Sequence, residues 1–316
     1  MAIFALVARR LLSTVPVLLA VALAAFILLR ISGGDPAAQL AGDNATPEAI
    51  AAIRSQLGLD QSLLVQFAKW GWLLLQGDFG ESIVSSVPVL RLIGQHSGPT
   101  VAVSLLTILF SVLVGVPLGV LAAWRRNGFI DQLASWTSTA GFAVPSFALG
   151  YLWIFLLSMK AGIFPVQGYV PIAGGVGQFL LHLALPVLTL SLVYVALISR
   201  VTRTSLLEVL SDDYVRTARA KGLPERVVVF RHALRNSAVP IVSIVGIGIA
   251  LLIGGVVVTE SVFNLPGLGR LTVDSVLARD YPVIQGVIIV FGVAYVLVNL
   301  LVDISYTFFD PRITLR

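Results

Sequence analysis

The sequence contains no cysteine, only three histidines and few charged residues: Asp, Glu, Lys and Arg make up 12% of its 316 residues. The absence of cysteine excludes a disulfide scaffold, a thiolate metal site and a cysteine nucleophile. A soluble domain carries about 25% charged and about 45–50% apolar residues, whereas 57% of this chain is hydrophobic and its mean hydropathy is +0.96. So little polar surface excludes a soluble or a disordered protein.

Motifs for catalysis and metal binding are also absent. His96, His182 and His232 are scattered and show no metal-ligand spacing. There is no His-Glu-x-x-His pattern and no Gly-x-Ser-x-Gly elbow, and Gly267-Leu268-Gly269-Arg270 lacks the lysine and the spacing of a phosphate loop. The sequence therefore predicts no catalytic residue, metal site or bound cofactor. If such a protein moves a solute uphill, the energy comes from another subunit.

Six apolar stretches are long enough to cross a membrane as helices, because a transmembrane helix needs about 20 mostly apolar residues. Six helices of this length with so few charges could not share one soluble core. The sequence therefore predicts an all-α integral membrane protein with six transmembrane helices. The predicted spans are 11–29, 100–124, 133–159, 179–199, 238–259 and 282–302.

Lysine and arginine are unequally divided between the two sides of such a protein. With the N-terminus inside, 14 of the 21 basic residues fall on the inner side, as the positive-inside rule requires. With seven acidic residues inside and nine outside, the two faces carry net charges of +7 and −2. We therefore expect both termini in the cytoplasm. The pI of 9.8 then reflects topology, and no nucleic-acid partner is expected.

The middles of the six predicted spans contain no Asp, Glu, His, Lys or Arg. Ion-coupled carriers place such residues along their path, so a secondary transporter is the weaker alternative. A membrane enzyme would need a nucleophile or metal cluster within the bilayer, which the spans lack. Small and kinking residues are frequent instead, among them the Gly-x-x-x-Gly pair Gly115 and Gly119, and Pro145. Such residues permit close helix packing and bending.

The long segment between the first two predicted spans, 32–99, can form a small extracytoplasmic cap. Residues 46–48, Thr-Pro-Glu, have the pattern of a helix start: a hydroxyl cap, then proline and an acid in the first turn. A second helix is predicted over 62–76, where two tryptophans suit the membrane interface. The cap is either a structural plug or a docking surface for an external partner, and the sequence leaves both open.

The connection between the fourth and fifth spans, 200–237, carries eight basic residues. Asp212 and Asp213 stand at a helix start, Gly222 ends that helix, and Pro224 opens another. An ordinary solvated loop needs no helix stop and restart, so the pattern predicts a rigid two-helix element that docks a protein. The pattern is similar to that of a helix-turn-helix DNA-binding motif, but the position of this segment between two membrane spans argues against DNA binding.

Motifs along nearly the whole chain resemble a known family. The most specific stretch is 213–223, Asp-Tyr-Val-Arg-Thr-Ala-Arg-Ala-Lys-Gly-Leu, followed by His-Ala-Leu-Arg-Asn at 232–236. The other matching motifs are Arg9-Arg10-Leu11, Gly34-Asp35-Pro36, Leu57-Gly58-Leu59-Asp60, Gln66-Phe67, Gly77-Asp78-Phe79-Gly80-Glu81-Ser82, Thr259-Glu260, Leu265-Pro266-Gly267-Leu268-Gly269-Arg270, Arg279-Asp280-Tyr281-Pro282 and Asp310-Pro311-Arg312. The chain resembles the permease subunits of binding-protein-dependent ABC importers, in particular the first of the two paired permeases of the dipeptide/oligopeptide/nickel branch.

The resemblance implies the type I ABC importer permease fold in the bacterial inner membrane. Its expected partners are a second homologous permease, two ABC ATPase domains that bind ATP and magnesium, an extracytoplasmic substrate-binding protein and membrane lipid. The chain itself would be non-catalytic and would form half of an alternating-access path. Di- and oligopeptides are the expected cargo; nickel, haem, opine and oligosaccharide relatives share the scaffold, so these cargoes stay open.

The resemblance also assigns candidate site residues. The ATPase-coupling helix would comprise Asp213, Tyr214, Arg216, Thr217, Ala218, Arg219, Ala220, Lys221, Gly222 and Leu223, with Arg219 and Lys221 meeting acidic or carbonyl groups of the ATPase. Arg216-Thr217-Ala218 stands where the family has Glu-Ala-Ala, so no role for a loop glutamate applies. A translocation path or outer gate would involve Glu260, Phe263, Asn264, Pro266 and Gly267; a purely structural loop is the alternative.

We therefore expect three parts: an N-terminal segment with the first span (1–31), the extracytoplasmic cap (32–99), and a five-helix permease core (100–316) that contains the coupling loop 200–237.

Overall fold

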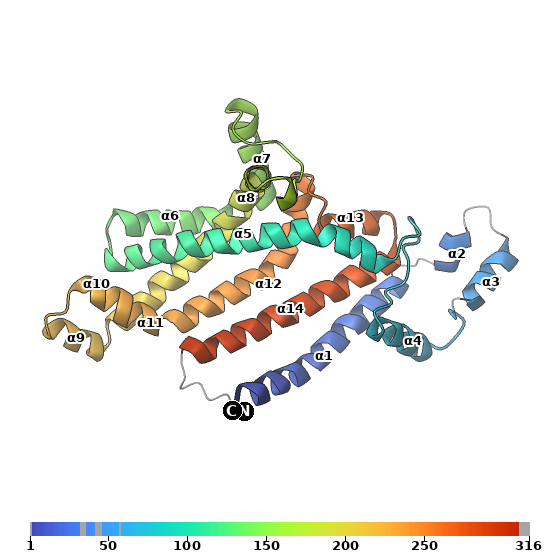
Figure 1. Cartoon of the computed structure of the whole chain (residues 1–316), viewed down its shortest axis with the longest axis horizontal. Helices are drawn as coiled ribbons and strands as arrows, with labels where there is room; N and C mark the ends of the chain where they lie inside the picture. The colour runs from blue at the N-terminus through green and yellow to red at the C-terminus, as the bar shows by residue number, and fades with distance from the viewer. Residues whose placement is uncertain (1, 32–35, 42–45, 57, 310–316) are drawn as a thin grey trace.

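The computed structural model describes residues 2–31, 36–41, 46–56 and 58–309. The motif residues 34–35, 57 and 310–312 lie outside this part of the chain. The described residues form helices, with one isolated bridge between Glu81 and Pro88. Long helices run side by side through the middle of the molecule, and groups of short helices lie at its two ends (Figure 1).

The predicted apolar spans coincide with long helices. Five of them lie in continuous helices, α1 (Ala2–Ile31), α5 (Val89–Trp124), α8 (Val176–Leu210), α12 (Ala238–Val262) and α14 (Tyr281–Phe309). Among the described residues, α5, α8 and α14 are long and apolar enough to cross a membrane alone, and two bent helix pairs raise the candidates to five. The apolar part of α1, Leu12–Leu28, is shorter. The count of six spans therefore stays a prediction.

The remaining predicted span, 133–159, is broken in two. It consists of α6 (Phe129–Ala143) and α7 (Ser146–Trp153), which continues as the π-helix η1 (Ile154–Lys160), and the two halves meet at 106°. Val144 is extended, with ψ 121°, because the ring of Pro145 disfavours helical conformation in the residue before it. The proline expected to bend the helix instead ends α6 and starts α7.

The Gly-x-x-x-Gly pair of α5 packs against α8 within the same chain. A Cβ atom on Gly119 would lie 2.6 Å from the Ser199 carbonyl oxygen and 2.7 Å from Cβ of Thr202. The backbones of the two helices can approach this closely only because Gly119 has no side chain. The glycine pair therefore allows α5 and α8 of the same chain to pack closely together.

The largest hydrophobic cluster lies where α5, α8 and α12 cross. Its members come from these helices, from the segment after α12 and, with Ile154, from η1; they include Val103, Leu183, Leu185, Leu190, Tyr194, Leu252, Val256, Phe263 and Leu265. A second cluster, with Val89, Leu268 and Val283, joins α5 to α14 and to α13 (Leu268–Leu277). The second cluster fixes α13 across the ends of two long helices.

The segment after α1 forms α2 (Pro36–Ala41), α3 (Pro47–Gln56) and α4 (Leu63–Leu75). The predicted start of α3 is confirmed, since the Ala49 amide donates to Oγ1 of Thr46 at 3.3 Å. The second predicted helix is confirmed as α4. Phe67 of α4 makes an edge contact with Phe26 of α1 and Trp70 makes a tilted one, with ring centroids 5.2 and 5.7 Å away. This aromatic cluster attaches α4 to α1.

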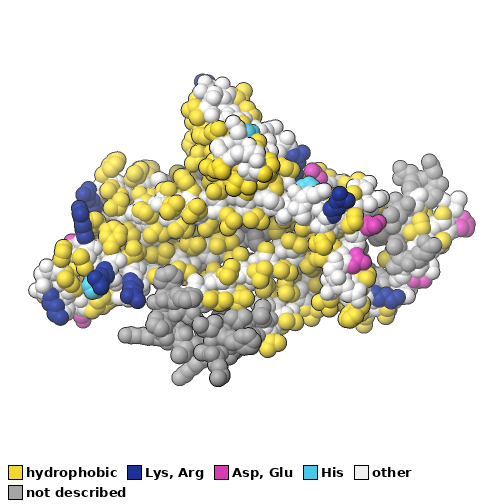
Figure 2. All heavy atoms as spheres, viewed as in Figure 1, with side chains coloured by type: hydrophobic (Ala, Val, Ile, Leu, Met, Phe, Trp, Pro, Cys, Tyr) yellow, Lys and Arg dark blue, Asp and Glu magenta, His cyan; other side chains and the backbone are white. Residues whose placement is uncertain are grey.

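The short helices mark the two ends of the molecule. α2, α3, α4 and α13 lie at one end, while α9 (Asp213–Ala220), α10 (Glu225–Val227) and α11 (Leu234–Asn236) lie at the other (Figure 1). α1 begins and α14 ends toward the end that carries α9–α11. On the visible face, hydrophobic side chains cover the long helices, and charged side chains gather at the ends (Figure 2).

Candidate functional site

The predicted two-helix element between the fourth and fifth spans is present. We call α9, α10, the π-helix η3 (Val228–Ala233) and α11, residues 213–236, the inner element, after the side of the membrane on which the sequence predicts it. α9 follows Asp212, which is extended with ψ 148°, and Gly222 ends it with a φ of +78°. Val215 and Ala218 of α9 are buried against Val228. This small core makes the inner element a folded unit.

The inner element is attached to the long helices through apolar contacts. Val229 and Ala233 of η3 are buried together with Val120 of α5 and Leu206 of α8. The rings of Trp124 and Phe230 add an edge contact at 6.4 Å. Because the element packs on α5 and α8 and then continues into α12, its position is fixed relative to three long helices.

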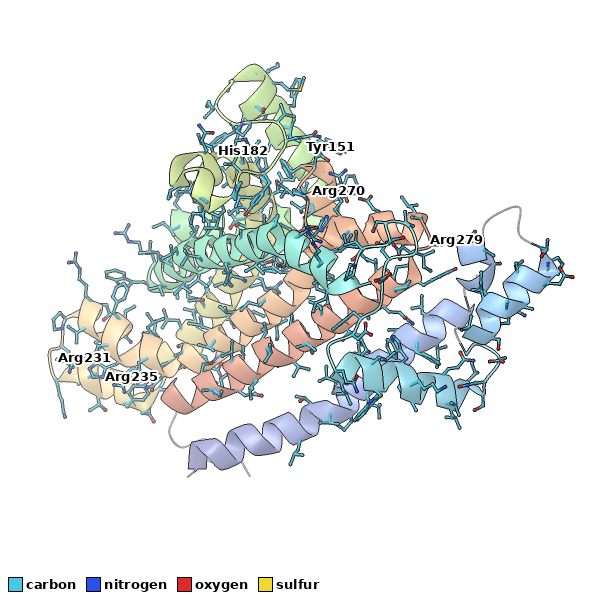
Figure 3. The ribbon with its side chains drawn as sticks, turned by 45° about the vertical axis from the view of Figure 1, so that its right-hand side comes forward. Tyr151, His182, Arg231, Arg235, Arg270 and Arg279 are labelled. Carbon is cyan, nitrogen blue, oxygen red and sulfur yellow. The ribbon has the colours of Figure 1, made fainter. Side chains whose placement is uncertain are left out.

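Nine of the ten predicted coupling residues are exposed on the inner element, and Ala218 is buried. The exposed ones are Asp213, Tyr214, Arg216, Thr217, Arg219, Ala220, Lys221, Gly222 and Leu223. Asn236 donates from Nδ2 to the Tyr214 hydroxyl at 2.6 Å, which holds the end of α11 against α9. Arg231 and Arg235 project from the following helices at the same end of the molecule (Figure 3). The tip of the molecule is therefore strongly basic.

Arg219 makes an ion pair inside the element. Its Nη2 donates to Oε1 of Glu225 at 2.7 Å and its Nε donates to Oε2 at 3.2 Å. This hydrogen bonding raises the pKa of the Arg219 guanidinium and lowers the pKa of the Glu225 carboxyl. The pair ties α9 to α10 across the Gly222 turn. The Arg219 side chain is still 40% exposed, so its expected contact with an ATPase stays a prediction.

A buried carboxylate lies at the opposite end of the molecule. Glu260, in the last turn of α12, is fully buried. Its Oε1 accepts a hydrogen bond from the Thr100 hydroxyl at 2.6 Å. Its Oε2 accepts one from the Arg270 amide at 3.0 Å, and the Gly269 amide also donates to the carboxylate. We call this arrangement the outer carboxylate site, and the end of the molecule that carries it the outer end, after the side of the membrane on which the sequence predicts them.

The outer carboxylate site caps the N-terminus of α13. The first amides of a helix have no partner in the helix, and an anion there is favoured by the helix dipole. Thr100 extends the cap, because its Oγ1 accepts from the Leu268 amide at 2.7 Å. A Cβ atom on Gly267 would lie 2.0 Å from Oε1 of Glu260. The Pro266-Gly267-Leu268-Gly269 sequence thus leaves room for the carboxylate.

The five predicted path or gate residues do not share one surface. Glu260, Phe263 and Gly267 are buried, with Phe263 in the largest hydrophobic cluster, whereas Asn264 and Pro266 are exposed. The Asn264 side chain accepts a hydrogen bond from the guanidinium of Arg270, which Figure 3 shows near the outer end of the long helices. Two of the five residues can meet a solute directly, and the other three hold the turn.

A second carboxylate, which sequence reasoning did not single out as a site, links α13 to residues 76–88 between α4 and α5, which we call the outer segment. Asp280 follows α13 and is buried, 4% exposed. It accepts hydrogen bonds from the Ser82 hydroxyl and, at 3.2 Å, from the Ile83 amide. Ser82 and Asp280 both belong to motifs of the family resemblance, but their separation of 198 residues hides the contact from a sequence pattern. Among the described residues, no group of three or more His, Asp or Glu could hold a metal ion.

Two family models together match most of the chain. A family model described as "Binding-protein-dependent transport system inner membrane component" matches residues 115–315, and the N-terminal model of the same system matches 3–98. The chain belongs to this family. The probable peptide ABC transporter permease protein y4tP of Sinorhizobium fredii is 51% identical over 305 residues, covering 96% of this chain and 97% of that protein.

Other relatives agree with this assignment. The glutathione transport system permease protein GsiC of Salmonella typhimurium is 43% identical over 307 residues, covering 97% of this chain and 98% of that protein. Among solved structures, a chain of the inward-facing MetNI methionine ABC transporter matches with a TM-score of 0.59 at 18% identity, covering 70% of this chain and 97% of that one. At this identity the match shows the fold alone.

Family membership confirms the main functional prediction. The protein is an inner-membrane permease component of a binding-protein-dependent ABC importer. It is non-catalytic and needs no cofactor of its own, since ATP is hydrolysed by a separate ATPase subunit. The family implies an ATPase and a binding protein as partners.

Proposed function

We propose that this permease imports di- and oligopeptides and forms half of the translocation path, the other half being a second homologous permease. The cargo proposal is supported by the relatives, which are named for peptide transport in Sinorhizobium fredii and Brucella suis and for glutathione, a tripeptide, in Salmonella typhimurium. Nickel, haem, opine and oligosaccharide are the alternative cargoes. In this proposal the chain crosses the membrane six times with both termini in the cytoplasm.

The inner element is the part that couples the permease to ATP hydrolysis. Each permease of the pair would seat α9 in a cleft of one of two ABC ATPase domains. The observation that carries this proposal is the folded, basic inner element packed on α5 and α8 and continuous with α12. A rigid element can pass on a displacement that a flexible loop would absorb.

The contact surface would consist of exposed side chains of α9 and of the turn that follows it. Tyr214 and Leu223 are 40% and 38% exposed and supply apolar contact, and Lys221 supplies charge. Arg219 acts indirectly, because its ion pair with Glu225 holds α9 in position. At the outer end, Asn264 and Pro266 would face the path, and the cap 32–99 would receive the binding protein.

The test of coupling compares three variants in the full complex. Lys221→Glu reverses a charge that the inner element does not need for folding, so we expect uptake and substrate-stimulated ATP hydrolysis to be lost while membrane insertion persists. Arg219→Glu should also abolish coupling, and the exchange Arg219→Glu with Glu225→Arg should restore part of it by re-forming the ion pair. Normal stimulated hydrolysis in Lys221→Glu would refute the coupling proposal.

The cargo is tested separately. The cognate binding protein is titrated with dipeptides, a tripeptide, an oligopeptide, nickel and haem, and uptake of the tightest ligand is measured in cells with and without this permease. We expect peptides to bind tightest and their uptake to depend on this chain. Tighter binding of nickel or haem would refute the peptide proposal and leave the permease function intact.

A further inference from the structure

One continuous stretch of chain connects the two ends of the molecule. The inner element ends at Asn236, and only Ser237 separates it from α12. Ser237 is buried and donates from Oγ to the carbonyl oxygens of Ala233, at 3.1 Å, and Ser205, at 3.3 Å. The junction is therefore short and hydrogen-bonded. The chain bends by 58° at this junction, and the hydrogen bonds of Ser237 hold the bend, which suits it to pass a displacement of the inner element on to α12.

At the other end of α12 the connection continues through Glu260. The carboxylate belongs to α12, and its partners belong to α5 and to the first turn of α13. The Arg270 guanidinium does not neutralise it, since that group bonds Asn264 and lies 3.6 Å from Asp274. Glu260 is thus held by hydrogen-bond donors alone, and these donors fix α13 on the end of α12.

Asp280 repeats this arrangement at the end of α13. Its own amide donates to the Ser275 carbonyl oxygen at 2.8 Å, which keeps it on the last turn of the helix. Its carboxylate binds Ser82 and Ile83 of the outer segment. The outer segment is held in turn by a bond from the Val89 amide to the Gly80 carbonyl oxygen at 2.9 Å. Two buried carboxylates therefore join three successive parts: α12, α13 and residues 80–83.

We propose that Glu260 and Asp280 are positioning residues for transport. Glu260 holds α13 on α12, and Asp280 holds residues 80–83 on α13. A movement of the inner element during the ATP cycle therefore reaches the outer surface, where the binding protein passes its cargo to the permease. This inference rests on the proposed coupling role of the inner element. A hydrogen-bonded carboxylate is suited to the task because its bonds have fixed directions, whereas apolar contacts permit sliding.

The test uses the full complex with both ATPases and the binding protein in lipid nanodiscs. Thr100→Val removes the hydroxyl that bonds Glu260 and Leu268, and Glu260→Gln and Ser82→Ala weaken the two carboxylate joints. The readout is the ratio of ATP hydrolysis with cargo-loaded binding protein to hydrolysis without it. We expect each variant to lower this ratio by about fivefold or more, and Thr100→Ser to restore it.

Thr107→Val is the matched control. Thr107 lies two turns further along α5, is fully buried, and its hydroxyl has no hydrogen-bond partner in the described part of the chain. Its replacement removes an equally buried hydroxyl from the same helix and should leave the ratio at the wild-type value. A merely structural role for Thr100 would lower the yield of folded complex without changing the ratio per folded complex.

A second readout follows α13 directly. The sequence has no cysteine, so Leu277→Cys, at a position that is 79% exposed at the end of α13, provides one labelling site in this chain, and the label on this chain is measured after the subunits are separated by electrophoresis. We expect its maleimide labelling rate to differ between the nucleotide-free and vanadate-trapped complexes, and this difference to vanish with Thr100→Val. An equal rate in both states of the otherwise native complex, or a difference that survives Thr100→Val, would overturn the proposal.

The outcomes separate this inference from the proposed function. If Lys221→Glu abolishes stimulation but Thr100→Val, Glu260→Gln and Ser82→Ala keep the wild-type ratio, the coupling role stands and the positioning role is wrong. If Lys221→Glu keeps normal stimulation, the coupling role itself fails. Loss of stimulation in all of these variants, with Thr107→Val normal, supports both.

Discussion

The Asp131 carboxylate and the Arg203 guanidinium form a bidentate ion pair that joins the first turn of α6 to the inner part of α8. Nη2 of Arg203 lies 2.9 Å from Oδ2, and the Asn127 amide donates to the same oxygen at 2.9 Å. The Asp131 side chain is 7% exposed and the Arg203 side chain 29%. This pair fixes the turn between α5 and α6, and the planar guanidinium suits its geometry.

The ion pair should contribute measurably to stability. Asp131→Asn leaves the guanidinium without a charged partner and should destabilise the folded chain by about 2 kcal/mol. Arg203→Lys keeps the charge but loses the two parallel bonds, and should cost less. Thermal unfolding of the two single variants and of the double variant in nanodiscs checks this. Strictly additive effects in this cycle would contradict the direct interaction.

The turn of the inner element should be sensitive to backbone geometry. Proline at position 222 cannot adopt the φ of +78° and has no amide hydrogen to donate to the Arg219 carbonyl oxygen, which the Gly222 amide contacts at 2.9 Å. Gly222→Pro should therefore abolish uptake while the protein still inserts into the membrane. Gly222→Asn should keep most of the activity, because asparagine tolerates this conformation. Full uptake with the proline variant would show that the turn does not matter.

The crossing of α5 and α8 should not tolerate a larger residue. Gly119→Ala places a Cβ atom 2.6 Å from the Ser199 carbonyl oxygen, so the helices must separate, at a cost of about 1–3 kcal/mol. Gly94→Ala, in the same helix, meets nothing within 4 Å and should stabilise the helix by about 1 kcal/mol. Melting temperatures that shift in opposite directions would confirm the contact. Equal shifts would exclude it.

The isolated chain should not hydrolyse ATP. The sequence has no phosphate loop, and the family assigns hydrolysis to a separate subunit. Purified permease in nanodiscs should therefore release no phosphate from ATP until the ATPase subunits are added. Turnover that remains after contaminating ATPases have been removed would contradict this expectation.

The sequence predicts the helices well because their signals are local. The long apolar stretches, the start of α3 at Pro47 and the stop at Gly222 each depend on residues close in the chain, and all are found in the structure. The sequence predicts a bend at Pro145 but not the angle of that bend. A bend of 106° depends on what the two halves pack against.

The outer carboxylate site could not be predicted, because its parts are distant in sequence. Thr100 and Glu260 are 160 residues apart, and nothing local to either residue shows that α5 and α12 bring them together. The family resemblance assigns Glu260 to the path or outer gate and Arg219 to a contact with the ATPase, and both assignments stay predictions. The structure adds the partner of each side chain within the chain, and these partners depend on how α5 meets α12 and how the Gly222 turn folds.

The length of α8 has a consequence for assembly. Its 35 residues extend about 52 Å at 1.5 Å per residue, whereas the hydrocarbon layer is about 30 Å thick and the whole bilayer about 40–45 Å. In the proposed orientation the excess projects into the cytoplasm and places α9, which follows the last turn of α8, outside the hydrocarbon layer. A water-soluble ATPase could then dock without displacing lipid, and its affinity should be similar in detergent micelles and in bilayers.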